Sequence, residues 1–166
     1  SMCAPLEDWS VYVADIGVQL ERLHARVEDT RMLSVRRLMY QVASHVADAT
    51  GAKAIVTGEA IGQKSSQTVA NLQVTETAVD LPVLRPLLTW DKQEIIARAR
   101  EIGTYEPATI DAGCNRVAPD QPETRASLSK VTGAEPDALP EWAETAAAEV
   151  EIVPLEEQWP RADGGP

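Results

Sequence analysis

The sequence predicts an α/β fold with a mostly parallel sheet flanked by helices. Short apolar runs of strand length occur at residues 11–13, 54–56 and 83–88, and helical patterns of apolar residues lie between them. Strands that alternate with helices are joined by crossover connections, and such connections place the strands parallel to one another. We expect one domain over residues 1–153, followed by a disordered tail over 154–166.

The first half of the chain is expected to hold two helices between two strands. After the run at residues 11–13, apolar residues at helical spacing predict a helix over about 17–27. The next helix has Ser34 as its expected N-cap, and Gly51 stands where a C′ glycine would end it. The run at 54–56 has the length and composition of a buried parallel strand.

The second half continues the alternation, with helices expected over about 67–79 and 91–102. Between them, residues 83–88 have a strand pattern in which Pro86 indicates an edge or a strand end. Gly103 is expected to end the second of these helices. The remaining predicted elements are a loop over about 104–121, helices over about 123–133 and 140–149, and a short strand at Ile152-Val153.

Charge and composition narrow the classes of function. Asp and Glu total 26 against 15 Lys and Arg, and the resulting charge of −11 repels a nucleic-acid backbone in low salt. No apolar run approaches the roughly 18 residues of a membrane-spanning helix, and nothing resembles a signal peptide, so a cytoplasmic location is expected. The acidic, lysine-poor, alanine-rich composition predicts a halophilic source, because molar salt screens self-repulsion. An ordinary acidic protein from a GC-rich genome is the alternative.

A polar segment with two glycines, residues 58–68, follows the strand predicted at 54–56. Ligands of parallel α/β sheets bind at the carboxyl ends of the strands. The glycines permit close backbone approach, the hydroxyls and amides can hydrogen-bond a polar ligand, and the following helix presents free N–H groups. The alternative is a solvated loop with a helix cap at Ser65 or Ser66, and neither a Walker A nor a GxGxxG pattern is present.

Several strings of the chain together resemble one known family. They are Arg37-Leu38-Met39, Val56-Thr57-Gly58-Glu59 through Gly62-Gln63 to Ser66-Gln67-Thr68, Asn71-Leu72, Leu84-Arg85-Pro86-Leu87, Asp91-Lys92, Glu94-Ile95-Ile96, Ala99-Arg100 and Ile102-Gly103-Thr104-Tyr105. Over about residues 30–120 the chain resembles the PP-loop domain of the ThiI-type tRNA 4-thiouridine sulfurtransferases. The resemblance implies a partial adenine nucleotide α-hydrolase-like fold.

The resemblance also implies a reaction and its ligands. Members of this family adenylate a uridine of tRNA with MgATP, and a persulfide sulfur then displaces AMP to leave 4-thiouridine. ATP and Mg²⁺ are therefore the expected cofactors, and a persulfide-carrying protein is an expected partner. The resemblance places Arg36, Gly58 and Gln67 on the nucleotide, where a guanidinium at Arg36 would pair with phosphate oxygens. The alternatives are a solvent-facing helix residue at Arg36 and a tight turn at Gly58.

Other side chains are candidates for contacts with the substrate. Glu59 and Ser66 are expected near the substrate or Mg²⁺, although Glu59 could equally cap the following turn. Cys114 resembles the family's catalytic cysteine by its position after the Gly-Thr-Tyr segment, and Arg116 would favour its thiolate. An inert core cysteine is the alternative at Cys114, and Cys3 is expected to be incidental. The cysteines and histidines do not show metal-ligand spacing, so no metal site within the protein is expected.

The chain also departs from the family. Its sequence contains no Ser-Gly-Gly-x-Asp-Ser pyrophosphate loop, no counterpart of the N-terminal tRNA-binding region and no rhodanese-like domain. We therefore expect an ATP-binding domain that is inactive as this chain alone and meets tRNA only through absent regions. The alternatives are a truncated, non-catalytic nucleotide-binding or assembly module, and sulfur transfer for the thiazole of thiamine. A sheet without its first strand–helix–strand unit exposes an apolar face, so a homo-oligomer is expected.

Overall fold

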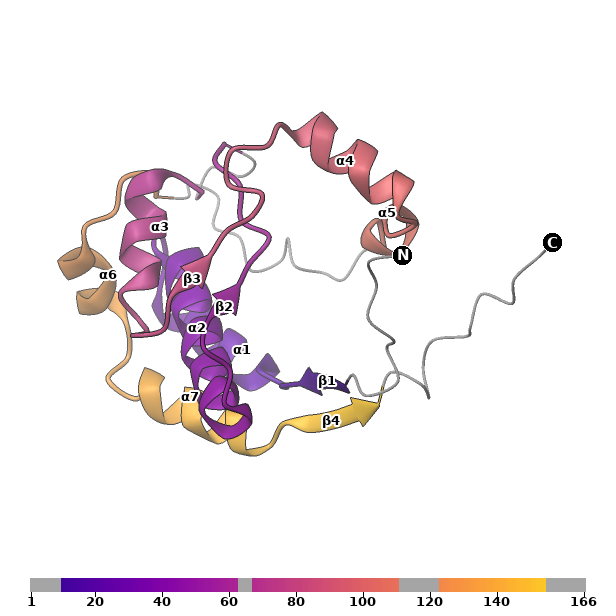
Figure 1. Cartoon of the computed structure of the whole chain (residues 1–166). Helices are drawn as coiled ribbons and strands as arrows, with labels where there is room; N and C mark the ends of the chain where they lie inside the picture. Colours follow the sequence, from indigo (N-terminus) through magenta and orange to yellow (C-terminus); the bar gives the residue numbers. More distant parts are fainter. Residues whose placement is uncertain (1–9, 63–66, 111–122, 155–166) are drawn as a thin grey trace.

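A computed structural model describes residues 10–62, 67–110 and 123–154 of the chain. The long helix α2 packs against α1, α3, α6, α7 and β2, and so organises the described part of the molecule (Figure 1). None of the described helices is both long enough and apolar enough to span a membrane. In chain order the elements are β1 (Ser10–Val13), α1 (Gly17–Arg26), α2 (Arg31–Thr50), β2 (Ile55–Val56), α3 (Val69–Glu76), β3 (Val83–Leu84), α4 (Lys92–Glu101), α5 (Tyr105–Ala108), α6 (Leu128–Ala134), α7 (Leu139–Ala148) and β4 (Glu151–Pro154).

The strands form two separate pairs. β1 pairs antiparallel with β4, with Val11 opposite Val153, and β2 pairs parallel with β3, with Ile55 opposite Val83. The predicted mixture of helices and strands is confirmed, but the mostly parallel sheet is not, because one pair of each kind is present in the described ranges. The antiparallel pair arises because α7 packs along α2 and is followed by the last strand, which then lies beside β1.

Local signals set several helix boundaries. The carboxylate of Asp91 accepts a hydrogen bond from the Gln93 N–H at 2.7 Å, and the carboxylate of Glu94 accepts one from the Asp91 N–H at 2.8 Å, so α4 begins with a capping box. Gly51 follows α2 with φ of 73°, as a C-terminal glycine should. The predicted cap at Ser34 is wrong, because α2 begins earlier, at Arg31, and Ser34 is fully buried within it.

Three apolar clusters surround α2. The main cluster lies between α1, α2 and α7, a second joins α2 to α3 and α6, and a third lies between α2 and the β2–β3 pair. Helices α4 and α5, by contrast, pack mainly on each other and contain no buried residue. The main cluster consists of Leu23, Val27, Val35, Leu38, Val42, Leu139, Trp142, Ala143 and Ala146.

Some predicted elements are shorter than the sequence suggested. β3 ends at Leu84, before Pro86, which agrees with the strand end indicated by that proline. α3 ends at Glu76 and α6 begins only at Leu128, after its cap Ser127. The predicted tail over 154–166 lies outside the described residues except for Pro154, the last residue of β4.

Candidate functional site

A cavity of about 640 Å³ lies beside α2 and reaches the carboxyl end of β2. It brings together Arg36 from α2, Gly58 from the segment after β2, and Gln67 from the segment before α3, which are the three residues predicted to contact a nucleotide. One end of the cavity is polar and also includes Tyr40, Thr57 and Glu59. The other walls are apolar and consist of Ile16, Leu20, Met32, Val35, Met39, Ala43, Ile55 and Val56.

The carboxylate of Glu59 is the centre of the polar end. Its Oε2 accepts hydrogen bonds from the Tyr40 hydroxyl, from the Thr57 hydroxyl at 3.1 Å and from Arg85 Nε at 2.9 Å. Its Oε1 lies 3.6 Å from Arg36 Nη1. These partners come from α2 and from the ends of both parallel strands, so Glu59 ties the three elements together.

Burial and hydrogen bonding act in opposite directions on the acidic groups of this end. Burial raises the pKa of Glu59, but the hydrogen bonds from Tyr40 and Arg85 and the charge of Arg36 outweigh it, and the pKa lies below its ordinary value. Burial and the neighbouring carboxylate both raise the pKa of Tyr40. At neutral pH Glu59 is therefore ionised, and Tyr40 is a neutral hydroxyl that donates to it.

The two arginines next to Glu59 differ in how fully they are bonded. Arg85 Nη1 donates to Glu76 at 2.7 Å and Arg85 Nη2 donates to Tyr40 at 3.3 Å, in addition to the bond from Nε to Glu59. Arg36 Nη1 is buried, and within the described residues it has no hydrogen-bond acceptor besides the longer ion pair with Glu59. Burial lowers the pKa of Arg36, although Glu59 opposes this effect. A buried donor without an acceptor costs free energy, so Arg36 is the group able to bind an incoming anion.

Gly58 and Gln67 shape the edge of the cavity. A Cβ built at Gly58 would meet no atom within 4 Å, and the φ of Gly58 lies outside the left-handed region, so this backbone is not a tight turn that requires glycine. Gln67 Oε1 accepts a hydrogen bond from the Ala60 N–H at 2.9 Å, and the Gln67 carbonyl accepts one from the Gly62 N–H at 3.2 Å. Gln67 thereby holds the segment after β2 in place, and Gly58 leaves space beside it.

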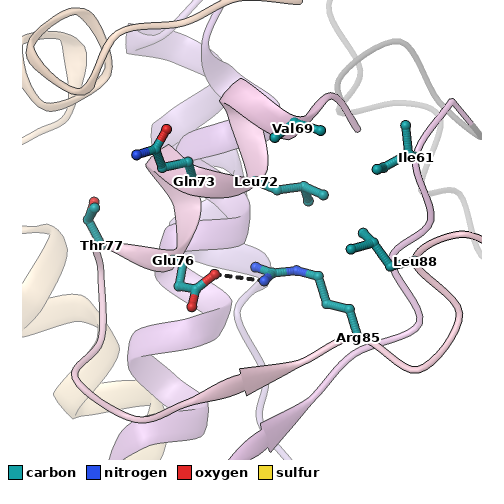
Figure 2. Close-up of a pocket in the computed structure, with 8 residues that line it drawn as sticks. All are labelled: Ile61, Val69, Leu72, Gln73, Glu76, Thr77, Arg85 and Leu88. Atoms are coloured by element: carbon teal, nitrogen blue, oxygen red, sulfur yellow. Dashed lines mark hydrogen bonds and ion pairs between the residues drawn. The ribbon is translucent and has the colours of Figure 1, made fainter.

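A second cavity, of about 540 Å³, lies between α3 and the segments that follow β2 and β3. Figure 2 shows the apolar side chains of Ile61, Leu72 and Leu88 near the side chain of Arg85, which extends toward Glu76 on α3. Arg85 therefore lines this cavity while it also bonds to Glu59 of the first cavity.

Tyr40 and Arg85 are site residues that the sequence analysis missed. A signal for Tyr40 existed, since it stands four positions after Arg36 and therefore shares its helix face. Arg85 follows β3 directly, at the same sheet edge as Gly58. Ser66, Cys114 and Arg116 lie outside the described residues, and their roles stay predictions. Among the residues that the structure does describe, no group of three His, Cys, Asp or Glu side chains could hold a metal ion.

Known proteins resemble this chain in sequence and in fold. Over 146 residues it is 58% identical to a protein of Halobacterium salinarum named "Probable tRNA sulfurtransferase", covering 88% of this chain and 37% of the relative. A protein of the same name from Moorella thermoacetica is 46% identical over 103 residues, covering 61% of this chain and 26% of that protein. A crystal structure of a 4-thiouridine synthetase–RNA complex with bound ATP matches with a TM-score of 0.77 and 36% identity, over 87% of this chain and 39% of that one.

Two facts follow from these comparisons. The chain spans little more than a third of the length of the Halobacterium salinarum relative and of the solved synthetase. That relative also agrees with the halophilic source predicted from the composition. The family described as "Thiamine biosynthesis protein (ThiI)" matches residues 7–138, and because this is well over half of the sequence, the chain belongs to the ThiI family.

Proposed function

We propose that the chain carries part of the ATP site of a tRNA sulfurtransferase that makes 4-thiouridine. The observation that carries the proposal is the buried Arg36 Nη1, which lacks a hydrogen-bond acceptor among the described residues and lines a mainly apolar cavity with Gly58 and Gln67. The apolar walls suit an adenine ring, and phosphate oxygens supply the acceptor that Arg36 lacks. Membership of the ThiI family and the ATP bound in the solved relative support this assignment.

In the proposed reaction, a uridine oxygen attacks the α-phosphorus of ATP, pyrophosphate leaves, and a persulfide sulfur then displaces AMP. The guanidinium of Arg36 would stabilise the negative charge that develops on the phosphate oxygens. Glu59 and Tyr40 hold the polar end of the cavity in place through their mutual hydrogen bond and their contacts with Arg85.

After AMP leaves, the transferred sulfur is still bonded to the sulfur of its carrier. In the proposal the Cys114 thiolate attacks the carrier sulfur, which breaks that S–S bond, releases the 4-thiouridine and leaves a disulfide between Cys114 and the carrier. Arg116 is the proposed cation that favours the Cys114 thiolate.

The remaining ligands and partners belong to the same proposal. Mg²⁺ would bind together with the phosphates of the nucleotide. A persulfide-carrying protein of the cytoplasm would donate the sulfur, and tRNA would be bound by polypeptide outside this sequence. We expect no tRNA thiolation by this chain alone, because its sequence lacks the pyrophosphate loop that the family resemblance leads one to expect. Losing even one backbone donor to a developing oxyanion lowers the rate by about 10²–10³-fold.

Calorimetric titration of the chain with MgATP, AMP and adenosine in about 2–3 M KCl tests the nucleotide site. Arg36→Ala should weaken the binding of AMP and MgATP by about tenfold or more, because a charge-assisted hydrogen bond is lost. The binding of adenosine, which has no phosphate, should be unchanged. Gln67→Ala should weaken all three, because the segment after β2 loses its anchor at Ala60. Arg98→Ala is the matched control, since Arg98 is an exposed arginine of α4 that pairs with Glu101.

Either outcome of the titration is informative. Absence of heat with all three ligands, in a sample whose circular dichroism shows folded helices, would replace the nucleotide site with a non-catalytic assembly module. Equal loss of AMP binding in Arg36→Ala and Arg98→Ala would show only non-specific attraction by positive charge.

A second candidate function is sulfur transfer for the thiazole of thiamine, which the description of the family favours. A deletion strain separates the two functions. Loss of 4-thiouridine from tRNA with normal growth in the absence of thiamine supports the tRNA function, whereas a thiamine requirement with normal 4-thiouridine supports the thiazole function.

A further inference from the structure

The carboxylate of Glu59 is shared unequally between the two arginines that flank it. Its Oε2 accepts a hydrogen bond from Arg85 Nε at 2.9 Å, and it also accepts from the hydroxyls of Tyr40 and Thr57. Its Oε1 lies 3.6 Å from Arg36 Nη1, which is longer than a hydrogen bond. The carboxylate is therefore bonded to Arg85 and only close to Arg36.

Arg85 is held from two further sides, so it keeps Glu59 in this orientation. Its Nη1 donates to Glu76 of α3 at 2.7 Å, and its Nη2 donates to the Tyr40 hydroxyl at 3.3 Å. Figure 2 shows the side chain of Arg85 extending from the end of β3 toward Glu76. The Arg85 side chain is only 9% exposed, and close packing restricts the positions open to a buried side chain.

Arg36 is the other cation that the Glu59 carboxylate could bond. The side chains of Arg36 and Glu59 are 14% and 11% exposed, so water solvates neither charge fully. Opposite charges attract more strongly where the solvent is largely excluded. Without Arg85 to hold Oε2, the carboxylate would turn toward Arg36, close the gap of 3.6 Å and occupy Nη1.

We propose that Arg85 is a positioning residue of the nucleotide site, which holds the Glu59 carboxylate away from Arg36 and keeps Arg36 Nη1 available to a phosphate oxygen. This inference rests on the proposed nucleotide site. Arg85 does not itself line the cavity that contains Arg36, so its effect on a phosphate passes through Glu59. The binding of adenosine, which has no phosphate, should not depend on Arg85.

A double-mutant cycle between Arg85 and Glu59, followed by calorimetric titration with AMP, tests the positioning. In Arg85→Met, AMP should bind about tenfold more weakly, because its phosphate must displace a carboxylate that is now bonded to Arg36. Adding Glu59→Gln removes this competitor, and the AMP affinity should return to within about threefold of the wild-type value. A purely structural role of Arg85 predicts a further loss instead, because the second substitution removes another member of the same network.

Three single variants separate positioning from unfolding and from net charge. Arg85→Lys keeps a cation that can bond Glu59 and should retain most of the AMP affinity. Glu59→Gln alone should keep or raise that affinity, because Arg36 loses its competing anion. Arg98→Met is the matched control, since Arg98 is an exposed arginine of α4, and molar KCl screens the general effect of charge.

The outcomes that overturn the proposal are distinct. A double variant that binds AMP no better than Arg85→Met overturns it, and so does an equal loss in Arg85→Met and Arg98→Met. If circular dichroism shows that Arg85→Met does not fold, Glu59→Gln decides. A tenfold loss of AMP affinity in folded Glu59→Gln would then show that Glu59 supports phosphate binding and does not compete with it, which overturns the proposal.

A crystal structure of Arg85→Met without nucleotide separates this inference from the proposed function. We expect Glu59 Oε1 to lie within about 3 Å of Arg36 Nη1, as in a hydrogen-bonded ion pair. A separation that stays at 3.6 Å overturns the positioning role. A closed pair in the variant, together with no binding of AMP by the wild type, supports the positioning role and overturns the nucleotide site.

Discussion

Helix α2 has a closed face and an open face, and neighbouring residues show the contrast. Leu38 is fully buried in the main cluster, whereas Met39, the next residue, is 52% exposed and lines the cavity that holds Arg36. Arg37 is hydrogen-bonded within the closed side, whereas Arg36 lines the open cavity and its Nη1 has no hydrogen-bond acceptor among the residues that the structure describes. The closed face therefore accounts for stability, and the open face holds the groups available to ligands.

The largest expected difference in unfolding free energy is between substitution of Arg37 and substitution of Arg36. Arg37 Nε donates to both oxygens of Glu135, at 2.9 and 3.2 Å, and Nη1 donates to the Val74 carbonyl at 3.0 Å and to Thr77 at 2.9 Å. Arg37→Ala leaves a buried carboxylate unpaired, so the free energy of unfolding in urea should fall by about 3–5 kcal/mol.

Arg36→Ala should change that free energy by less than about 1 kcal/mol, because Glu59 keeps its partners Tyr40, Thr57 and Arg85. If both arginine variants lose the same stability, the two faces do not differ in the way described.

Substitution of Leu38 should likewise cost more unfolding free energy than substitution of its neighbour Met39. Leu38→Ala opens a cavity in the main cluster and should cost about 2–5 kcal/mol of unfolding free energy. Met39→Ala removes an exposed side chain and should stay within about 0.5 kcal/mol of the wild-type value. Urea unfolding followed by circular dichroism measures both free energies. A large loss in Met39→Ala would mean that Met39 is buried in solution.

Acidification should lower the stability contributed by Glu59 on the open face and raise that contributed by Glu135 on the closed face. The pKa of Glu59 in the folded chain is below its ordinary value. Ionised Glu59 therefore stabilises the fold at every pH above the ordinary pKa of a glutamate, and this stability is lost as the pH falls through the lower pKa of the folded state. Burial raises the pKa of Glu135 despite the charge and hydrogen bond of Arg37. Ionised Glu135 therefore costs stability, and protonation relieves that cost as the pH falls through its raised pKa.

The measurement is the unfolding free energy from about pH 7 to about pH 3 at constant salt. Glu59→Gln should flatten the loss of stability on acidification, and Glu135→Gln should make it steeper. Identical slopes in the two variants would contradict the opposite pKa shifts.

A small loss of stability is expected at the rim of the closed face. The guanidinium of Arg22 lies 5.3 Å from the centre of the Trp142 ring. Arg22→Ala should lower the unfolding free energy by about 0.5–1 kcal/mol, the usual contribution of an exposed cation–π pair. Arg22→Lys should keep part of it, and a loss above that range would show that Arg22 has another structural role.

The parts of the fold that the sequence predicted well depend on short-range signals. The bounds of α4 follow from Asp91, Glu94 and Gly103, which are close in sequence and bond to the backbone of the same helix. The strand pairing could not be predicted in this way, because β4 and β1 are far apart in the chain and meet only through the packing of α7 on α2. Of the site, Arg36, Gly58 and Gln67 were predicted from the family resemblance, and the cavity brings them together.

The sequence by itself determined the order of helices and strands apart from α5, the short helix within the loop predicted over 104–121, and it also determined the family and the candidate nucleotide residues. These features depend on periodicity, capping and local strings. Only the tertiary structure decided which neighbouring residue of α2 is buried and which is open. Arg36 and Arg37 are chemically identical, and periodicity does not tell which face meets α3 and α6. That choice depends on side chains such as Glu135 and Arg85, which are distant in sequence and adjacent only once the chain has folded.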